Sequence, residues 1–313
     1  MKILLTGAGG DIAQSMVRTL RSYFNDIGLV GCDLAPQPLA SVFLDAFYTS
    51  QQVSDKSYLS RIREICEIEK IDLIIPVTEP EIEFFSREMP QVSAKVLLAN
   101  QMAIKVGLDK LATSQFMLQL GGFAPHTFAE YQGSGLELPV VVKPRSGRGS
   151  RNVFVCKTIE DVEYHQRNGD SMIFQELLEP ADMEVTCGVY ATNENRVLSI
   201  QLLRKLSGGR TSWARVINNE QISILCEEIA HGLSLRGAIN VQLILTDQGP
   251  KVFEINPRYS STVEMRHRLG FMDLVWGVEE TLFQKPVVYD AHMSGSLVGR
   301  FDEIVILENG ESI

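Results

Sequence analysis

The sequence lacks the features that would place the protein outside the cell or in a membrane. Its 313 residues contain five cysteines, at scattered positions and without a C-x-x-C pair. Scattered thiols in odd number argue against a disulfide framework and against a zinc site. No stretch approaches the roughly 18 apolar residues of a membrane span, and the apolar start leads straight into a glycine turn. We therefore expect a cytoplasmic protein without a membrane partner.

Positive charge is also in short supply. The chain has 29 Lys and Arg residues against 39 Asp and Glu residues, which gives a net charge of -10. An acidic surface repels phosphate backbones, so nucleic acid is not an expected partner. The length exceeds that of one typical domain, and two or three structural units are expected. The sequence does not set the oligomeric state and leaves a homodimer open.

Residues 1–100 show an alternation of apolar strands and amphipathic helices. Strands are predicted at 2–6, 27–32, 71–77 and 95–98, and helices at 11–23 and 59–68. This order predicts an α/β unit with a Rossmann-like parallel sheet that carries helices on both faces. The pattern then changes, first to a long helix predicted at 101–120. Hairpins are predicted further along the chain, at 138–156 and 239–255.

A glycine-rich turn follows the first strand. Gly7, Gly9 and Gly10 lie between the first predicted strand and helix, and Asp33 ends the next strand, where a dinucleotide-binding fold places its ribose-binding acid. A nicotinamide cofactor is therefore one interpretation. The third glycine of G-x-G-x-x-G is missing, so we favour a structural or substrate-contacting turn.

A lysine and a loop rich in glycine and arginine follow each other in the middle of the chain. The apolar strand 138–142 delivers Lys143, and the loop 145–151 comes next. Lysine offers a point charge to a polyphosphate, and glycines let backbone N–H groups approach it closely. Because the lysine precedes the glycines, this is not a Walker A loop. A solvated basic hairpin tip is the alternative.

Side chains with oxygen ligands end two later strands. Glu254 and Asn256 alternate on one predicted strand, so both leave the same face, and Gln242 lies on the neighbouring strand. Carboxylate and amide oxygens suit Mg²⁺ beside bound phosphates. Arg258 follows two residues later, in a position to hold a transferred phosphoryl group. We favour this function over a merely polar strand edge.

In this order, the motifs resemble the ATP-grasp superfamily, and most of all the ATP-grasp unit of carbamoyl phosphate synthase large subunits and related carboxylate–amine ligases. The matching segments are Asp109-Lys110, Val142-Lys143-Pro144, the loop Ser146–Ser150, Gln175-Glu176-Leu177, Glu184, Asn240-Val241-Gln242 and Glu254-Ile255-Asn256-Pro257-Arg258. Residues 1–100 are similar to the Rossmann-like domain that precedes such units. The resemblance implies a two-subdomain α+β ATP-grasp fold after it. Its parts would be 101–178 with a phosphate lid loop, 179–290 with the metal site, and a C-terminal extension at 291–313.

The same resemblance implies a role for each matched residue. The residues implied to bind ATP are Lys110 and Lys143 at the phosphates, Ser146, Gly147 and Gly149 in a mobile lid, Gln175, Glu176 and Leu177 at the adenine, and Glu184 at the ribose. The implied ligands of one or two Mg²⁺ (or Mn²⁺) ions are Gln242, Glu254 and Asn256. Arg258 would stabilise the transferred phosphoryl group. Gln242 replaces an acidic ligand found in many relatives, which lowers the negative charge of the site.

A second basic segment has no motif to explain it. Residues 204–215 carry several cations around Gly208 and Gly209. We hypothesise that the segment lines the acceptor side, with Arg215 as a catalytic residue that binds an ATP phosphate or a substrate carboxylate. An exposed basic loop is the alternative.

These observations predict an ATP- and magnesium-dependent ligase. It would phosphorylate a small-molecule carboxylate to an acyl phosphate and transfer the acyl group to a small-molecule amine. An NAD(P)-dependent oxidoreductase or epimerase that uses the first glycine turn is one alternative. It has no Tyr-x-x-x-Lys pair and leaves residues 109–258 without a purpose. A nucleotide-binding module without catalysis is the other alternative.

Overall fold

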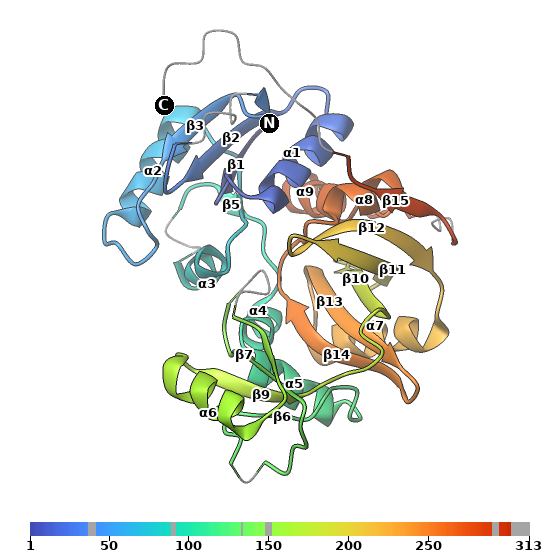
Figure 1. Cartoon of the computed structure of the whole chain (residues 1–313). Coiled ribbons are helices and arrows are strands. Elements are labelled where there is room, and N and C mark those ends of the chain that lie inside the picture. Colours follow the sequence, from blue (N-terminus) through green and yellow to red (C-terminus); the bar gives the residue numbers. More distant parts are fainter. Residues whose placement is uncertain (37–41, 89–91, 133, 148–151, 290–293, 302–313) are drawn as a thin grey trace.

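The computed structural model describes residues 1–36, 42–88, 92–132, 134–147, 152–289 and 294–301. Within them the chain forms three sheets (Figure 1). The predicted lid residue Gly149 and most of the predicted extension 291–313 lie outside the described residues. No helix in the described ranges is long and apolar enough to cross a membrane.

The N-terminal unit is a five-stranded parallel sheet in the order β3-β2-β1-β4-β5. Its strands are β1 (Lys2–Thr6), β2 (Gly28–Asp33), β3 (Ala46–Thr49), β4 (Leu73–Pro76) and β5 (Lys95–Val96), and its helices are α1 (Asp11–Tyr23), α2 (Tyr58–Glu69) and α3 (Glu79–Glu88). The central strands β1 and β4 are buried almost throughout, as expected for parallel strands that helices cover on both faces. The predicted Rossmann-like unit is confirmed. The short edge strand β3 was not predicted, because it is only half-buried and its apolar pattern is weak.

The helix predicted at 101–120 is wrong in one respect, because the chain forms two helices there. These are α4 (Gln101–Gly107) and α5 (Lys110–Gln119). Asp109 lies between them as the N-cap of α5, and its Oδ1 accepts hydrogen bonds from the backbone N–H groups of Leu111 and Ala112 at 2.9 and 3.2 Å. A capping carboxylate begins a new helix at this position.

A small antiparallel sheet follows, in the order β6-β9-β7-β8. Its strands are β6 (Thr127–Phe128), β7 (Val140–Pro144), β8 (Phe154–Cys156) and β9 (Met172–Glu176), with α6 (Ile159–Asn168) packed against them. Strands β7 and β8 form the predicted hairpin. The sheet has a small core of its own, which contains Val140, Val142 and Phe174.

The third sheet has six antiparallel strands in the order β14-β13-β10-β11-β12-β15. They are β10 (Glu184–Ala191), β11 (Val197–Ser207), β12 (Arg210–Ile217), β13 (Gly237–Thr246), β14 (Gly249–Asn256) and β15 (Leu297–Gly299). The helices of this part are α7 (Glu220–Gly232), α8 (Val263–Arg268) and α9 (Asp273–Phe283). The predicted hairpin of β13 and β14 is present, with Gln242 opposite Glu254 and Asn240 opposite Asn256.

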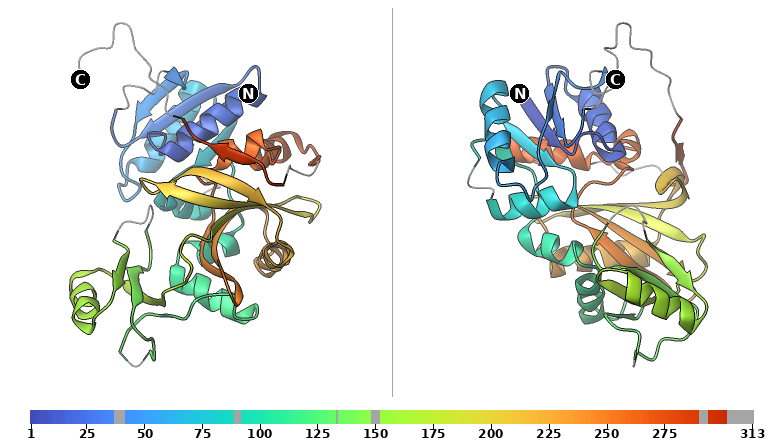
Figure 2. Two further views of the ribbon diagram at one scale, coloured as in Figure 1. Left: turned by 45° about the vertical axis from the view of Figure 1, so that its right-hand side comes forward. Right: turned by 60° about the vertical axis from the view of Figure 1, so that its left-hand side comes forward.

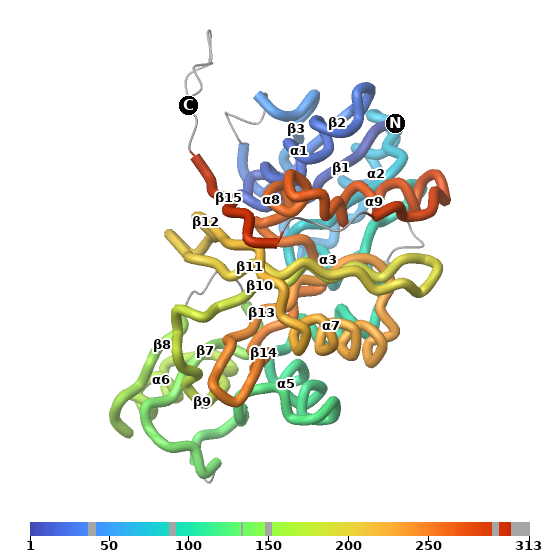
Figure 3. Tube along the Cα trace, turned by 90° about the vertical axis from the view of Figure 1, so that its right-hand side faces the viewer, coloured from blue at the N-terminus to red at the C-terminus, as the bar shows by residue number. Residues whose placement is uncertain are grey.

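The two faces of the large sheet belong to different cores. On one face, residues such as Val241 and Ile255 pack with α7 and also with α4 and α5. On the other face, α8 and α9 lie between the sheet and the N-terminal unit, as Figures 2 and 3 show. A continuous apolar cluster runs through them, from Ile200 and Trp276 to Val17 on α1. Helices α4 and α5 of the predicted unit 101–178 therefore share a core with the large sheet, and only β6–β9 and α6 of that unit have a separate core.

Candidate functional site

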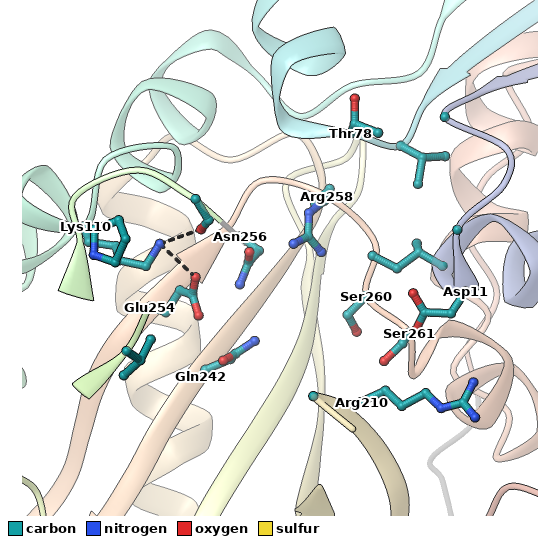
Figure 4. Close-up of a pocket in the computed structure, with 18 of the residues that line it drawn as sticks. Asp11, Thr78, Lys110, Arg210, Gln242, Glu254, Asn256, Arg258, Ser260 and Ser261 are labelled. Carbon is teal, nitrogen blue, oxygen red and sulfur yellow. Dashed lines mark hydrogen bonds and ion pairs between the residues drawn. The ribbon is translucent and has the colours of Figure 1, made fainter. Parts of the chain in front are cut away.

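A cavity of about 1750 Å³ opens between the three sheets. The N-terminal sheet contributes the carboxyl ends of its strands, where Gly7, Asp33 and Thr78 lie. Ligand sites of open parallel sheets form at this edge, because the loops there surround a crevice. Figure 4 shows side chains of the N-terminal unit and of the large sheet pointing toward one space.

Lys143 reaches the cavity from the end of β7. Its side chain is 5% exposed, and its ammonium donates hydrogen bonds to Oε1 of Gln175 at 2.8 Å and to the carbonyl oxygen of Phe253 at 3.4 Å. Burial lowers the pKa of Lys143 to about 8, while the Glu254 carboxylate opposes this change and Lys110 adds to it. Among the residues that the structure describes, no carboxylate forms an ion pair with this buried ammonium, so it is positioned to receive an anion.

Lys110 lies opposite the metal-ligand candidates. As the first residue of α5, it is held next to the capping Asp109, whose carboxylate also pairs with Arg145 at 2.6 Å. The ammonium of Lys110 donates to the carbonyl oxygen of Gly147 at 2.8 Å and lies 3.3 Å from Oε1 of Glu254 (Figure 4). This ion pair shows that a cation fits beside the Glu254 carboxylate.

Glu254, Gln242 and Asn256 line the cavity from neighbouring strands. Gln242 is directly opposite Glu254, and residues opposite each other in an antiparallel pair project from one face. One carboxylate and two amide oxygens are hard ligands of the kind that Mg²⁺ takes. No cluster of three or more His, Cys, Asp or Glu side chains suited to a metal occurs in the described part of the chain. A magnesium ion here would therefore need phosphate oxygens or water to complete its shell.

Arg258 leaves the same strand two residues after Asn256. Its guanidinium lies 3.4 Å from Oε1 of Glu79 and donates to the carbonyl oxygen of Tyr259 at 3.2 Å. It lines the cavity between the metal-ligand candidates and Ser260 (Figure 4).

A buried ion pair stabilises the segment that follows β14. Arg266 donates to the hydroxyl of Ser260 at 2.9 Å and lies 2.6 Å from Asp273, and both charged side chains are 1% exposed. Position 188 requires glycine, because a Cβ there would lie 2.6 Å from Cδ of Arg266. The pair holds the chain that follows β14 in place.

The residues predicted to contact the adenine also line the cavity, namely Gln175, Glu176 and Leu177. The backbone N–H of Glu176 donates to the carbonyl oxygen of His126 at 2.9 Å, and its carboxylate accepts from the N–H of His126 at 3.0 Å. The side-chain oxygen of Gln175 accepts the hydrogen bond from Lys143, and its Nε2 donates to the Thr127 hydroxyl at 2.8 Å. Gln175 therefore positions Lys143.

Glu184, the predicted ribose ligand, lines the cavity from the start of β10. It pairs with the buried Arg204 of β11, whose Nε lies 3.1 Å from the Glu184 carboxylate. The pair leaves the carboxylate partly neutralised at the cavity wall.

The first glycine turn does not support a nicotinamide site. The carboxylate of Asp33 accepts hydrogen bonds from the N–H groups of Gly9 and Leu34, at 2.8 and 2.6 Å. One oxygen of Asp33 thus closes the turn and the other binds the N–H of the residue that follows Asp33, although the turn does border the cavity through Gly7 and Gly10. Gly7 has φ +64°, and a Cβ there would lie 2.4 Å from Cγ2 of Thr78, so this turn requires glycine.

Two predicted site residues have other positions. Arg215 is exposed on β12 and is not among the described residues that line the cavity, so its assignment to the acceptor side is corrected. The segment is a hairpin with a register shift between Lys205 and Leu206, and the cations that line the cavity from it are Arg204 and Arg210. Ser146 is exposed at the rim, beside the lining residue Gly147.

Several residues at the other end of the cavity were not predicted. The side chains concerned are Asp11, Thr78, Ser261 and Arg300, whereas Arg210 belongs to the segment 204–215 that was expected to line the acceptor side. They come from segments far apart in the sequence, so spacing gave no sign of them. Asp11 alone carried a signal, as the acidic residue that opens α1 after the glycine turn.

Family models match most of the chain. One described as ATP-grasp domain matches residues 108–262, and one described as PylC-like, N-terminal domain, matches residues 3–97. The carbamoyl-phosphate synthase of Methanobrevibacter smithii is 21% identical over 138 residues, which cover 39% of this chain and 36% of that protein. The chain thus spans about a third of the length of this relative.

Solved structures share the fold. The ADP complex of N5-carboxyaminoimidazole ribonucleotide synthetase matches with a TM-score of 0.74 at 13% identity, over 95% of this chain and 80% of that one. The L-amino acid ligase of Bacillus licheniformis matches with a TM-score of 0.72 at 14% identity, over 91% of this chain and 74% of that one. Likeness at such identities concerns the fold alone.

Proposed function

This chain belongs to the ATP-grasp superfamily, and from that premise we propose that it is an ATP- and magnesium-dependent ligase that joins a small carboxylate to a small amine. The observation that carries the proposal is the meeting of Lys143, Lys110 and Glu254 at one end of the cavity. Two cations and a carboxylate on facing elements suit a nucleotide polyphosphate with its metal. The fold relatives, one of them in complex with ADP, support the same assignment.

The nucleotide would lie between the small sheet and the large sheet. Lys143 and Lys110 hold its phosphates, and the segment Glu176–Leu177 borders the adenine. Because the N–H of Glu176 is engaged by His126, Glu176 would contact the base through its carbonyl oxygen. Glu184 faces the ribose, with Arg204 restraining its carboxylate.

Glu254 and Asn256 at the end of β14, with Gln242 opposite Glu254 on β13, fit a magnesium ion. When bound, magnesium neutralises the charge that develops on the transferred phosphoryl group. Lys110 then exchanges its contact with Glu254 for one with phosphate oxygens. Arg258 lies beyond Asn256 and holds the phosphoryl group as it passes to the substrate carboxylate.

The proposed reaction has two steps. A substrate carboxylate oxygen attacks the γ-phosphorus of ATP, so that an acyl phosphate forms and ADP leaves. The amine nitrogen then attacks the acyl carbon, an amide forms, and phosphate and one proton leave. The second step requires that water be kept from the acyl phosphate, which would otherwise be hydrolysed.

The test is a screen of carboxylate and amine pairs for phosphate release by the purified protein with ATP and MgCl₂. The expected result is release that requires both substrates and falls at least about a hundredfold in Lys143→Met, since a charge-assisted contact to phosphate is lost. Lys157→Met is the matched control, because Lys157 is exposed beyond β8 and outside the cavity lining. Equal turnover by Lys143→Met and the parent would contradict the proposal.

A further inference from the structure

Arg258 is paired with a carboxylate of the N-terminal unit. Its guanidinium lies 3.4 Å from Oε1 of Glu79, the first residue of α3, and the two side chains are 13% and 15% exposed. The described residues that line the cavity include Arg258 but not Glu79. The carboxylate therefore lies behind the guanidinium, away from a ligand in the cavity. The pair also joins two separately matched segments, because Glu79 falls within residues 3–97 and Arg258 within residues 108–262.

The start of α3 is a well-fixed base for Glu79. The backbone N–H and the hydroxyl of Thr78 donate to Oε2 of Glu81, at 3.3 and 2.6 Å, which is the glutamate half of a capping box. The hydroxyl of Tyr58 donates to the other oxygen of Glu81 at 3.2 Å, and Glu81 is 6% exposed. Pro80 fixes φ in the first turn of the helix. Glu81 is thus used to begin the helix, and Glu79 is left to reach the large sheet.

The backbone on the other side of the pair is also fixed. Tyr259, the residue after Arg258, is 8% exposed and belongs to the core that the large sheet shares with the N-terminal unit. Its hydroxyl donates to the carbonyl oxygen of Asp273 at 3.4 Å. Among the residues that the structure describes, Glu79 is the one ion-pair partner of Arg258. Because the backbone is held by packing, the contact with Glu79 sets the direction of the guanidinium.

The contact with Glu79 leaves donors of Arg258 available to a ligand. A guanidinium carries five N–H groups, of which Nη2 contacts Glu79 and Nη1 donates to the carbonyl oxygen of Tyr259. Lys110 differs in this respect, because its partner Glu254 itself lines the cavity and competes with a bound phosphate. A guanidinium that is already oriented loses less freedom when it binds a phosphoryl group. The carboxylate therefore orients Arg258 and does not compete for the ligand.

We propose that Glu79 is a positioning residue for phosphoryl transfer, which holds the guanidinium of Arg258 toward the γ-phosphate of the bound nucleotide. The inference rests on the proposed function, because Glu79 acts through an arginine of that site. Figure 4 shows Arg258 next to Asn256, one of the metal-ligand candidates, and so on the side of the γ-phosphate. Through this contact the N-terminal unit takes part in the transfer step. The affinity for the γ-phosphate then depends on a side chain that touches no ligand.

The test compares the affinities for ADP and for AMPPNP, a non-hydrolysable analogue of ATP, by isothermal titration calorimetry on the full chain with MgCl₂. The Kd for ADP divided by the Kd for AMPPNP, which we name the γ-phosphate ratio, isolates the contribution of the third phosphate. Glu79→Ala should lower this ratio at least about fivefold and leave the affinity for ADP unchanged. Glu79→Gln keeps an acceptor oxygen at the same place and should lower the ratio less.

A double-mutant cycle separates positioning from a general structural effect. Arg258→Met should lower the γ-phosphate ratio by itself. Adding Glu79→Ala to it should lower the ratio no further, because the carboxylate acts through the guanidinium. Glu64→Ala is the matched control, since it removes an exposed carboxylate of the same unit, which pairs with Arg61 on α2 outside the cavity lining. This control should leave both affinities unchanged.

An unchanged γ-phosphate ratio in Glu79→Ala would overturn the proposal. Equal losses from Glu79→Ala in the parent and in the Arg258→Met background would also overturn it, because the two residues would then act independently. Retained affinity for ADP shows that the variants are folded. A parent protein that binds no ADP would instead contradict the proposed function, and this separates the two failures.

Discussion

The ammonium of Lys143 on β7 donates a 2.8 Å hydrogen bond to the side chain of Gln175 on the adjacent strand β9. Gln175 is itself held by the hydroxyl of Thr127, from β6. The candidate phosphate ligand is therefore oriented by a relay that crosses three strands of the small sheet. This relay accounts for the fixed position of a long side chain in the wall of an open cavity.

Replacing Gln175 by leucine removes the acceptor from this relay. The buried ammonium then loses a charge-assisted hydrogen bond, and we expect ADP to bind about tenfold more weakly because Lys143 is no longer held at the phosphates. Isothermal titration calorimetry measures the change. Thr127→Val keeps the Lys143–Gln175 bond and should show a smaller effect. Equal ADP affinity in Gln175→Leu and the parent would show that the relay has no part in binding.

Proton uptake should accompany nucleotide binding in mildly alkaline solution. Burial lowers the pKa of Lys143 to about 8 in the free protein, so above that pH most molecules carry a neutral Lys143. Bound phosphates favour the charged form and raise this pKa, so binding near pH 8.5 takes up a proton. Calorimetry in two buffers with different ionisation enthalpies measures the uptake.

Near pH 6.5 the same lysine is already charged in the free protein, and the uptake from it should vanish. Lys143→Met should show no difference between the two pH values that can be assigned to this group. An uptake of the same size in that variant would assign the proton to another residue.

Replacing Glu254 by glutamine should separate the metal from the nucleotide. Lys110 loses its 3.3 Å partner and is free to pair with phosphate, so ADP without metal should bind at least as tightly as in the parent. The gain in affinity that MgCl₂ provides should be lost with the carboxylate ligand. Titrations of ADP with and without MgCl₂ measure both effects. Glu163→Gln, on the exposed face of α6, is the control that should keep the magnesium dependence.

The buried pair of Arg266 and Asp273 should matter for stability. Arg266→Met leaves the carboxylate of Asp273 buried without its partner, and we expect a loss of about 3–5 kcal/mol in the free energy of unfolding. Chemical denaturation measures the change. Arg268→Met removes an exposed i,i+4 partner of Glu264 on the same helix and should cost less than about 0.5 kcal/mol. A similar small loss in Arg266→Met would show that the pair is dispensable.

The sequence predicted those parts of the molecule that depend on local pattern. Continuous apolar runs located β1 and β4, and the alternation of Glu254 and Asn256 gave the shared face that the register of β13 and β14 confirms. The break before α5 was missed because apolar spacing continues through it. The capping role of Asp109 was the available signal.

The part of the cavity lined by Asp11 and Arg300 could not be predicted from spacing. Arg300 lies beside α1 only because β15 pairs with β12, and nothing local in either segment indicates this pairing. That Arg210 lines the cavity and Arg215 does not has a different cause. Arg215 lies opposite Leu203, one residue out of phase with the pair of Arg204 and Ala214, so its side chain leaves the face of the sheet away from the cavity. Charge composition carries no information about which face a strand residue occupies.

The small sheet has an apolar core of its own, while the N-terminal sheet and the large sheet share one through α8 and α9. The two larger sheets therefore form one packed unit. The lobe of β6–β9 and α6 does not share that core. Lys143 and Gln175 belong to this lobe, whereas Glu254 and Arg300 belong to the large sheet and the residue that follows it. A rotation of this lobe would therefore move Lys143 and Gln175 away from Glu254, and it would open the proposed nucleotide site without disturbing the core that the two larger sheets share.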